Sequence, residues 1–121
     1  MAWRQNIARA GLAGKVDIRL GPAIETLPTL EGPFDLAFID ADKESNAVYF
    51  DHAVRLSRPG TVIVVDNVIR DGRVIDAHGN AQVQGVRRMM DSIRSDDRVT
   101  ATAVQTVGVK GYDGFLMAIV P

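Results

Sequence analysis

The sequence predicts an α/β fold with an open, mainly parallel sheet that closes with an antiparallel hairpin. Two short apolar runs, Phe34–Ile39 and Thr61–Val65, alternate with helical segments and stop at acidic residues. Such near-continuous apolar runs are typical of parallel strands covered on both faces. The end of the chain contains two strand-like segments around a glycine-containing turn, which favours a hairpin. Strands that alternate with helices and then close with a hairpin indicate this fold class.

The first third of the chain predicts a helix, a strand and a second, shorter helix. Ala2–Ala10 carries its apolar residues at helical spacing, and two glycines follow that can end the helix. Lys15–Leu20 alternates apolar and charged residues, as a half-buried strand does. Ala23–Leu30 follows a Gly-Pro turn and has the pattern of a short helix.

The middle of the chain contains both apolar strands and the helix that connects them. Phe34–Ile39 stops at an aspartate, and Ser45–Ser57 then predicts a helix that an Arg-Pro-Gly turn closes. Thr61–Val65 is the second strand. Val68–Gln82 predicts an irregular loop that is long for a connection in a compact domain, and loops of this length are often functional.

The last third predicts one surface helix and the hairpin. Val83–Ser95 is amphipathic, and its charged face needs no partner other than water. Val99–Val107 and Gly111–Val120 then form two antiparallel strands. The residues that we expect on the inner face of the helix are Val86, Met90 and Ile93.

Composition narrows the functional classes. The chain has 121 residues, of which 46% are hydrophobic and 24% charged, so residues 1–121 fit a single globular domain. Its net charge of −1 gives no electrostatic footprint for nucleic acid or an anionic membrane, and we expect neither as a partner. Without cysteine there is no disulfide, thiolate metal site or cysteine nucleophile. We expect a cytoplasmic protein.

Acidic residues stand at the carboxyl ends of both apolar strands. Asp40 follows the first strand, and Asp66 with Asn67 follows the second. In open α/β sheets ligands bind at this end, and neighbouring strands lie only about 4.8 Å apart. Two carboxylates and an amide oxygen suit a hard divalent cation such as Mg²⁺. A neighbouring cation disfavours the ammonium form of Lys43, and a general base has to be unprotonated to accept a proton.

Each of these residues also has a simpler interpretation. An aspartate at a strand end often caps the next helix or solvates a turn. For Asp40 and Asp66 together the cation is favoured, because two adjacent carboxylates at a buried sheet edge repel one another unless a positive charge relieves them. In the simpler interpretation, Lys43 only forms a salt bridge with Asp40 or Asp42, which is the ordinary role of a lysine beside an aspartate.

Four segments of the sequence resemble the cation-dependent S-adenosylmethionine (SAM) O-methyltransferases of the catechol and caffeoyl-CoA type. The resemblance spans essentially the whole chain. Its most specific parts are Phe-Asp-Leu-Ala-Phe-Ile-Asp40-Ala-Asp42-Lys43 and Val-Asp66-Asn67-Val. The Leu-Ser-Arg-Pro-Gly turn that ends at residue 60 and the closing Gly-Tyr-Asp113-Gly-Phe are the other two.

The resemblance implies a role for particular residues. By match, Asp40, Asp66 and Asn67 correspond to the metal ligands and Lys43 to the catalytic lysine. Ala23 stands where members of the family turn past the adenine of SAM, so Ala23 and Asp40 are the implied cofactor contacts. The implied reaction moves a methyl group from SAM to a hydroxyl of a catechol-like or caffeoyl-CoA-like aromatic molecule.

The chain matches only the carboxyl-terminal part of the family pattern. The expected fold is therefore a partial Rossmann-like methyltransferase sheet that lacks the first strands and the Gly-rich turn, since no Gly-x-Gly occurs. We expect the strand that ends at Asp40 to have a bare apolar edge, weak or absent cofactor binding by this chain alone, and a homo-oligomer formed through that edge.

Three other functional classes compete with this interpretation. A phospho-receiver domain needs an acidic pair at the end of its first strand, whereas the first expected strand ends at Leu20. A metal-dependent phosphohydrolase that uses Asp40, Asp42 and Asp66 needs a phosphate-binding turn that the sequence lacks. A family fragment that folds by association, keeps the metal site and catalyses nothing stays open.

Overall fold

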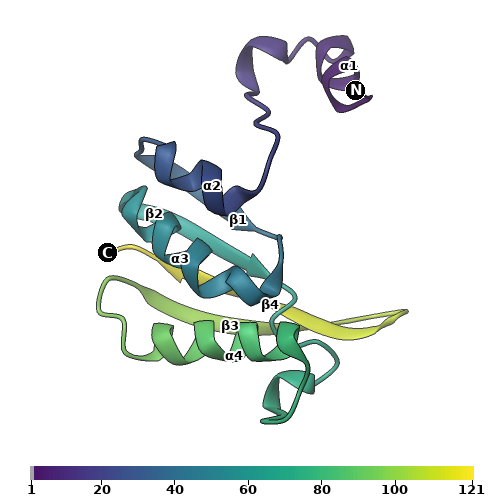
Figure 1. Ribbon diagram of the computed structural model, residues 1–121, viewed down its shortest axis with the longest axis vertical. Coiled ribbons are helices and arrows are strands. Elements are labelled where there is room, and N and C mark those ends of the chain that lie inside the picture. Colours follow the sequence, from purple (N-terminus) through teal and green to yellow (C-terminus); the bar gives the residue numbers. More distant parts are fainter. Residues whose placement is uncertain (1) are drawn as a thin grey trace.

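The computed structural model describes residues 2–121, and its centre is one four-stranded sheet (Figure 1). The strands are β1 (Phe34–Ile39), β2 (Ser57–Asp66), β3 (Thr100–Gly108) and β4 (Gly111–Ile119), in the spatial order β1-β2-β4-β3. β1 and β2 are parallel, and the other two pairings are antiparallel. The predicted α/β sheet and carboxyl-terminal hairpin are confirmed, and the described sheet is mixed.

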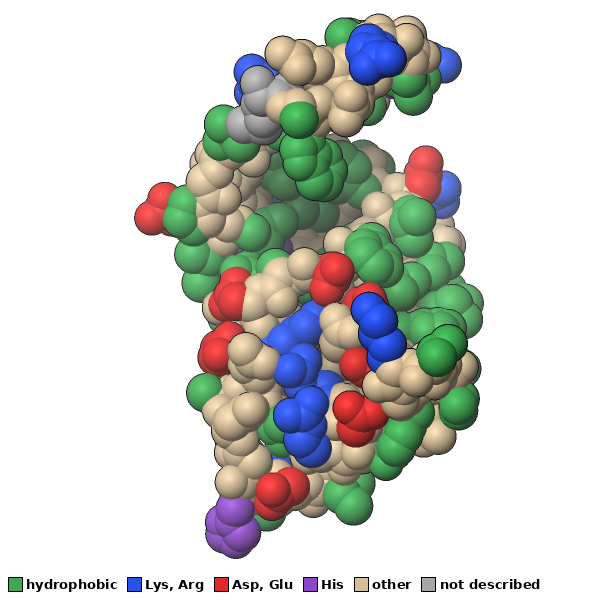
Figure 2. Space-filling model, turned by 90° about the vertical axis from the view of Figure 1, so that its right-hand side faces the viewer, with side chains coloured by type: hydrophobic (Ala, Val, Ile, Leu, Met, Phe, Trp, Pro, Cys, Tyr) green, Lys and Arg blue, Asp and Glu red, His purple; other side chains and the backbone are tan. Residues whose placement is uncertain are grey.

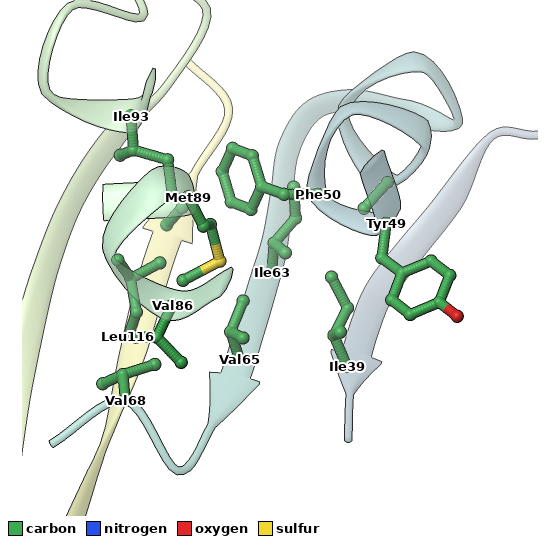
Figure 3. Packing of buried hydrophobic residues seen from close by; sticks show 12 residues of the cluster. Ile39, Tyr49, Phe50, Ile63, Val65, Val68, Val86, Met89, Ile93 and Leu116 are labelled. Carbon is green, nitrogen blue, oxygen red and sulfur yellow. The ribbon is translucent and has the colours of Figure 1, made fainter. Parts of the chain in front are cut away.

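Two helices, α3 (Asn46–Arg55) and α4 (Ala81–Arg94), pack on the same face of this sheet. Their inner residues meet those of β2 and β4 in one core, in which Met89 of α4 and Phe50 of α3 lie above the strands (Figure 3). Met89 is fully buried, and Met90, which was predicted to face inward, is half-buried and packs against the same core. Both spacings from Val86 fit a helix, so both methionines can reach the core, with Met89 at its centre and Met90 at its margin.

Several boundaries differ from the expected ones for local reasons. α4 begins at Ala81 because the side chain of Asn80 caps it, accepting a hydrogen bond from the Val83 N–H at 2.9 Å. β2 begins at Ser57, which pairs with Phe34, so the Arg-Pro-Gly segment lies within an irregular start of the strand. The predicted long loop before α4 is confirmed, and it contains only one short 3₁₀ turn, Arg73–Ile75.

The first helix, α1 (Ala2–Arg9), and a 3₁₀ turn at Ala13–Lys15 lie apart from the sheet (Figure 1). The next helix, α2 (Ala23–Thr26), is continued by a 3₁₀ turn and lies beside β1, where Ala23 packs against the core. α1 has no buried residue. The predicted strand Lys15–Leu20 is wrong, because the alternating segment has no strand beside it among residues 2–121 with which to form a hydrogen-bonded ladder. Leu20 is 67% exposed.

β1 is an edge strand with an exposed apolar face. Leu36 and Phe38 are each 62% exposed, whereas Ile39 faces α3 and is buried. The expectation that β1 is covered on both faces is therefore wrong, and the expected bare apolar edge is confirmed. Register places Leu36 beside Val62 and Phe38 beside Val64. Figure 2 shows hydrophobic side chains gathered along one flank of the molecule, with charges of both signs beside them.

The described helices are all short. The longest, α4, has 14 residues, and none in residues 2–121 has the length and apolar character needed to cross a membrane.

Candidate functional site

Sheet register brings the predicted acidic residues to one edge. Ile39 of β1 is the lateral partner of Val65 of β2 in the parallel pairing, so Asp40 and Asp66 follow at the same end of adjacent strands. This confirms that the two strands are neighbours. Asp40 is exposed, whereas Asp66 and Asn67 are half-buried.

The chain turns sharply at Asn67, immediately after β2. Asn67 has φ of 60°, in the left-handed region that asparagine tolerates better than most residues. Oδ1 of Asp66 accepts the Asn67 N–H at 2.8 Å, which stabilises the turn. This contact engages only one oxygen of Asp66 among the hydrogen bonds of residues 2–121. The capping role and the ligand role of this carboxylate are therefore compatible.

Lys43 bridges the ends of the two strands. Its side chain is only 8% exposed, and Nζ lies 3.0 Å from the backbone oxygen of Asp66 and 3.4 Å from Oδ1 of Asp40. The salt bridge with Asp40 is thus present but long. The buried amine is therefore held in contact with both strand ends.

α4 fixes the turn that carries Lys43. Lys43–Ser45 forms a 3₁₀ turn, and Gly85 of α4 packs directly against its backbone. A Cβ at Gly85 would lie 2.2 Å from the Lys43 oxygen and 2.6 Å from Cα of Glu44, so only glycine permits this approach. Arg88 of α4 also donates a hydrogen bond to the Glu44 oxygen at 3.2 Å.

A second contact orders the segment between β1 and α3. Tyr49 donates its hydroxyl to Asp42, and Tyr49 is buried (Figure 3). Hydrogen bonds from Ser45 and Tyr49 lower the pKa of Asp42. Burial, with the Asp42 carboxylate beside it, raises the pKa of Tyr49. Asp42 therefore accepts hydrogen bonds as a carboxylate at neutral pH and holds the strand end to the helix.

Asp113 is the residue at this edge to which the sequence analysis gave no role. Its carboxylate accepts hydrogen bonds from the backbone N–H groups of Ile69, Arg70 and Gly114 and from the side chain of Asn67. Burial alone would raise the pKa of Asp113, but these donors outweigh it and lower the pKa. The Asp-Gly pair in the closing motif was the available signal, since glycine after a turn-facing carboxylate often marks close backbone approach.

An apolar cavity opens beside the strand ends. It has a volume of about 340 Å³, and its lining includes both residues implied as cofactor contacts, Ala23 and Asp40. Leu27, Phe38 and Tyr49 are among the other lining residues. A predominantly apolar cavity with a few polar groups is typical of small-molecule sites.

The donor atoms at the strand ends are two carboxylates and one amide. Residues 2–121 contain no group of three or more His, Cys, Asp or Glu side chains that could hold a metal ion. The three oxygen donors Asp40, Asp66 and Asn67 still lie at one edge, with Lys43 contacting both strands. The structure thus brings together every predicted site residue except Ala23 around the strand ends, and Ala23 lies on the adjoining cavity.

The chain has a Rossmann-like α/β sheet. Acidic residues and a buried lysine lie at the carboxyl ends of its parallel strands, and an apolar cavity lies beside them. This combination defines a class of small-molecule enzyme folds. Within this class the chain belongs to the O-methyltransferase family, which residues 2–118 match.

Known proteins similar to the chain agree with this family. The chain is 52% identical to the Catechol O-methyltransferase of Mycobacterium tuberculosis over 118 residues, which cover 97% of this chain and 54% of that protein. The crystal structure of the O-methyltransferase from Bacillus cereus in complex with SAH superposes with a TM-score of 0.92 at 52% identity, covering 98% of this chain and 56% of that one.

A further structure is that of the O-methyltransferase TomG from Streptomyces achromogenes, involved in tomaymycin synthesis, in complex with SAM. It has a TM-score of 0.90 at 49% identity and covers 96% of this chain and 54% of that chain. The chain thus spans about half the length of the relatives it matches.

Proposed function

We propose that this chain supplies the cation-binding and proton-accepting part of a SAM-dependent O-methyltransferase whose acceptor is a catechol-like or caffeoyl-CoA-like aromatic hydroxyl. The observation that carries the proposal is the convergence of Lys43, Asp40 and Asp66 at adjacent parallel strand ends. The name of the mycobacterial relative and the SAH and SAM in two similar crystal structures support it.

The residues present fit a hard divalent cation. In the hydrogen bonds of residues 2–121, Asp66 uses Oδ1 and Asp40 uses Oδ1, so each carboxylate has a second oxygen to offer. Asn67 uses its amide nitrogen, so its Oδ1 is the third donor. Oxygen donors of this kind suit Mg²⁺, which commonly keeps other positions for water and substrate oxygens. Asp40, Asp66 and Asn67 would hold it.

Lys43 is the proposed proton acceptor. When bound, SAM supplies the methyl group and a divalent cation supplies Lewis-acid stabilisation to an acceptor hydroxyl whose unperturbed pKa is about 10. The buried Nζ of Lys43 is the group placed to take the proton of that hydroxyl. Its contact with the Asp66 backbone oxygen keeps Nζ at the strand ends, so the residue contributes orientation as well as basicity.

The cavity that Ala23 and Asp40 share is the proposed place for the adenosyl part of SAM. Its lining is largely apolar, and Ala23 leaves room for a flat ring because its side chain is a single methyl group. Asp40 lies where the cavity meets the strand ends, so it is the residue that links the cofactor region to the cation region.

Methyl transfer itself tests the proposal. Initial rates would be measured with SAM and either catechol or caffeoyl-CoA, in Mg²⁺ or in EDTA. We expect rates that depend on Mg²⁺ and that fall by roughly 10²–10⁴-fold in Lys43→Met. The control is Lys15→Met, at an exposed lysine outside the site, which should retain the wild-type rate. Equal, measurable rates in Lys43→Met and Lys15→Met would contradict the role of Lys43, whereas no methyl transfer even by wild type would contradict the proposed function as a whole.

The exposed apolar face of β1 favours a second candidate function. In this alternative the chain is a catalytically inactive family fragment that folds by oligomerisation and keeps only the metal site. Leu36 and Phe38, together with the unpaired edge of β1, offer a surface through which copies associate. Calorimetry with S-adenosylhomocysteine separates the candidates, because the fragment would bind Mg²⁺ but neither bind this ligand nor transfer methyl groups.

We propose a homo-oligomer in either case. The same exposed edge supports this proposal, because the outer backbone N–H and C=O groups of β1 have only water as a hydrogen-bond partner in an isolated chain. Light scattering tests it, and a monodisperse, stably folded monomer would contradict it.

A further inference from the structure

Four hydrogen-bond donors converge on the carboxylate of Asp113. Three are backbone N–H groups, from Arg70 at 2.9 Å, Ile69 at 3.2 Å and Gly114 at 2.9 Å. The fourth is Nδ2 of Asn67 at 3.1 Å. Asp113 lies on β4 and the donors from residues 67–70 lie in the loop after β2, so one side chain connects the loop to the sheet.

The two oxygens of this carboxylate have separate tasks. Oδ1 accepts all three backbone N–H groups, and Oδ2 accepts the side chain of Asn67. Three donors on one oxygen fix the rotation of the carboxylate, so Oδ2 has a defined direction. Hydrogen bonds to an ionised carboxylate are about twice as strong as neutral ones, which makes this arrangement rigid.

An ionised carboxylate accepts hydrogen bonds and cannot donate them. The side chain of Asn67 must therefore turn its NH₂ group toward Asp113, and its carbonyl oxygen remains for another partner. Without Asp113, the amide can rotate by half a turn and present NH₂ at the strand ends, where it would repel a cation.

We propose that Asp113 is a positioning residue that fixes the amide of Asn67 so that Oδ1, and not NH₂, is presented with Asp40 and Asp66 to a divalent cation. This inference rests on the proposed cation site and assigns the residue that determines its third donor. Asp113 does not itself touch the cation, since its contacts are with Asn67 and the loop backbone.

The local backbone shows that this position is tightly built. Gly114 follows Asp113, and a Cβ there would lie 2.3 Å from the Val104 oxygen and 2.5 Å from Cγ1 of Ile69. Val68 N–H also donates to the Gly114 oxygen at 3.1 Å. The loop therefore follows β4 closely, and Asp113 has little freedom to find other partners.

Asp71 provides a matched control. Oδ1 of Asp71 accepts the Tyr112 N–H at 2.9 Å, and the Asp71 N–H donates to the Tyr112 oxygen at the same distance. Asp71 thus fastens the same loop to the same strand without a hydrogen bond to Asn67. If Asp113 acts only by holding the loop, Asp71→Asn and Asp113→Asn should have similar effects.

The test is a titration of the full chain with Mn²⁺, followed by electron paramagnetic resonance, with Mg²⁺ as competitor. In Asp113→Asn, the single amide oxygen cannot serve both the backbone donors and Asn67, so its NH₂ group faces the NH₂ of Asn67. We expect Mn²⁺ affinity to fall by roughly 10–100-fold, the usual effect of losing a residue that orients a ligand, and to stay within about twofold of wild type in Asp71→Asn.

The double variant Asn67→Asp/Asp113→Asn exchanges the two side chains. Asn at 113 then accepts the backbone N–H groups through its oxygen and donates its NH₂ group to Asp at 67, which keeps one oxygen for the cation. We expect Mn²⁺ affinity at least 10-fold above that of Asp113→Asn, a rescue that a purely structural role does not predict. Circular dichroism establishes that each variant is folded.

The outcomes separate the inference from the proposed function. Mn²⁺ binding by wild type that is unchanged in Asp113→Asn, or equally weakened in Asp71→Asn without rescue by the double variant, overturns the positioning role alone. A folded wild-type chain that binds no Mn²⁺ overturns the cation site, and the positioning role with it.

Discussion

Replacing Gly85 with alanine tests how the fold places Lys43. The added Cβ would lie 2.2 Å from the Lys43 oxygen, 2.6 Å from Cα of Glu44 and 2.7 Å from the Lys43 carbonyl carbon. All three are backbone atoms, which cannot rotate away as a side-chain end can. α4 must therefore move away from the turn that carries Lys43.

The magnitude follows from two opposing terms. Overpacking a tight site costs about 1–3 kcal/mol, and the backbone contacts place Gly85→Ala at the upper end. Alanine in a helix interior returns about 1 kcal/mol relative to glycine. We therefore expect a net loss of about 2 kcal/mol in the free energy of unfolding, which lowers the urea midpoint by roughly 1–2 M for a domain of this size.

The assay is urea denaturation followed by circular dichroism, together with methyl-transfer rates. The matched control is Gly14→Ala, because a Cβ at Gly14 meets nothing within 4 Å, and its urea midpoint should stay at the wild-type value or rise slightly. If Gly85→Ala is as stable and as active as Gly14→Ala, the close packing of α4 against the Lys43 turn has no energetic role, and the reasoning is refuted.

Three further predictions follow from other parts of the structure. Arg98 lowers the pKa of Asp96 below 3.8, so the stability that this pair contributes is full above that pH and is lost as pH falls through the lower, folded-state pKa. Urea midpoints of wild type and Asp96→Asn should therefore differ at pH 7 and converge in acid, and a gap that persists or widens in acid would contradict the assignment. Phe38→Lys should reduce self-association in light scattering, because it places a charge on the exposed apolar face of β1, and an unchanged oligomer would exclude that face as the contact. Lys43→Met should keep Mn²⁺ affinity within a few-fold of wild type while losing methyl transfer, and loss of both would mean that Lys43 holds the strand ends together.

The strands at the site could be predicted from the sequence because their signals are local and strong. The observed β1 has the predicted bounds, Phe34–Ile39, since an apolar run between a Gly-Pro break and an aspartate has no competing periodicity. The segment Lys15–Leu20 has an equally clear alternation, yet it is irregular. A strand requires a neighbour for its backbone hydrogen bonds, and alternation alone does not reveal whether one is present.

The candidate site also has one part that was predictable from the sequence and one part that was not. The placement of Asp40, Asp66 and Asn67 at one edge of the sheet was predictable, because each follows a parallel strand at its carboxyl end, and the register confirms that these ends are adjacent. The hydrogen bonds of Asp113 were not predictable, because they come from donors more than 40 residues away along the chain that only the folded β2–β4 pairing brings together.

The most direct test of the central claim is a Mn²⁺ titration of the folded chain and of Asp66→Ala, with Asp91→Ala as control at an exposed carboxylate of α4. The proposed strand-end site predicts one saturable site in wild type and in Asp91→Ala, competed by Mg²⁺ and lost in Asp66→Ala. Equal Mn²⁺ affinity in wild type and Asp66→Ala, or no binding by a folded wild-type chain, would contradict it and leave these carboxylates as turn caps.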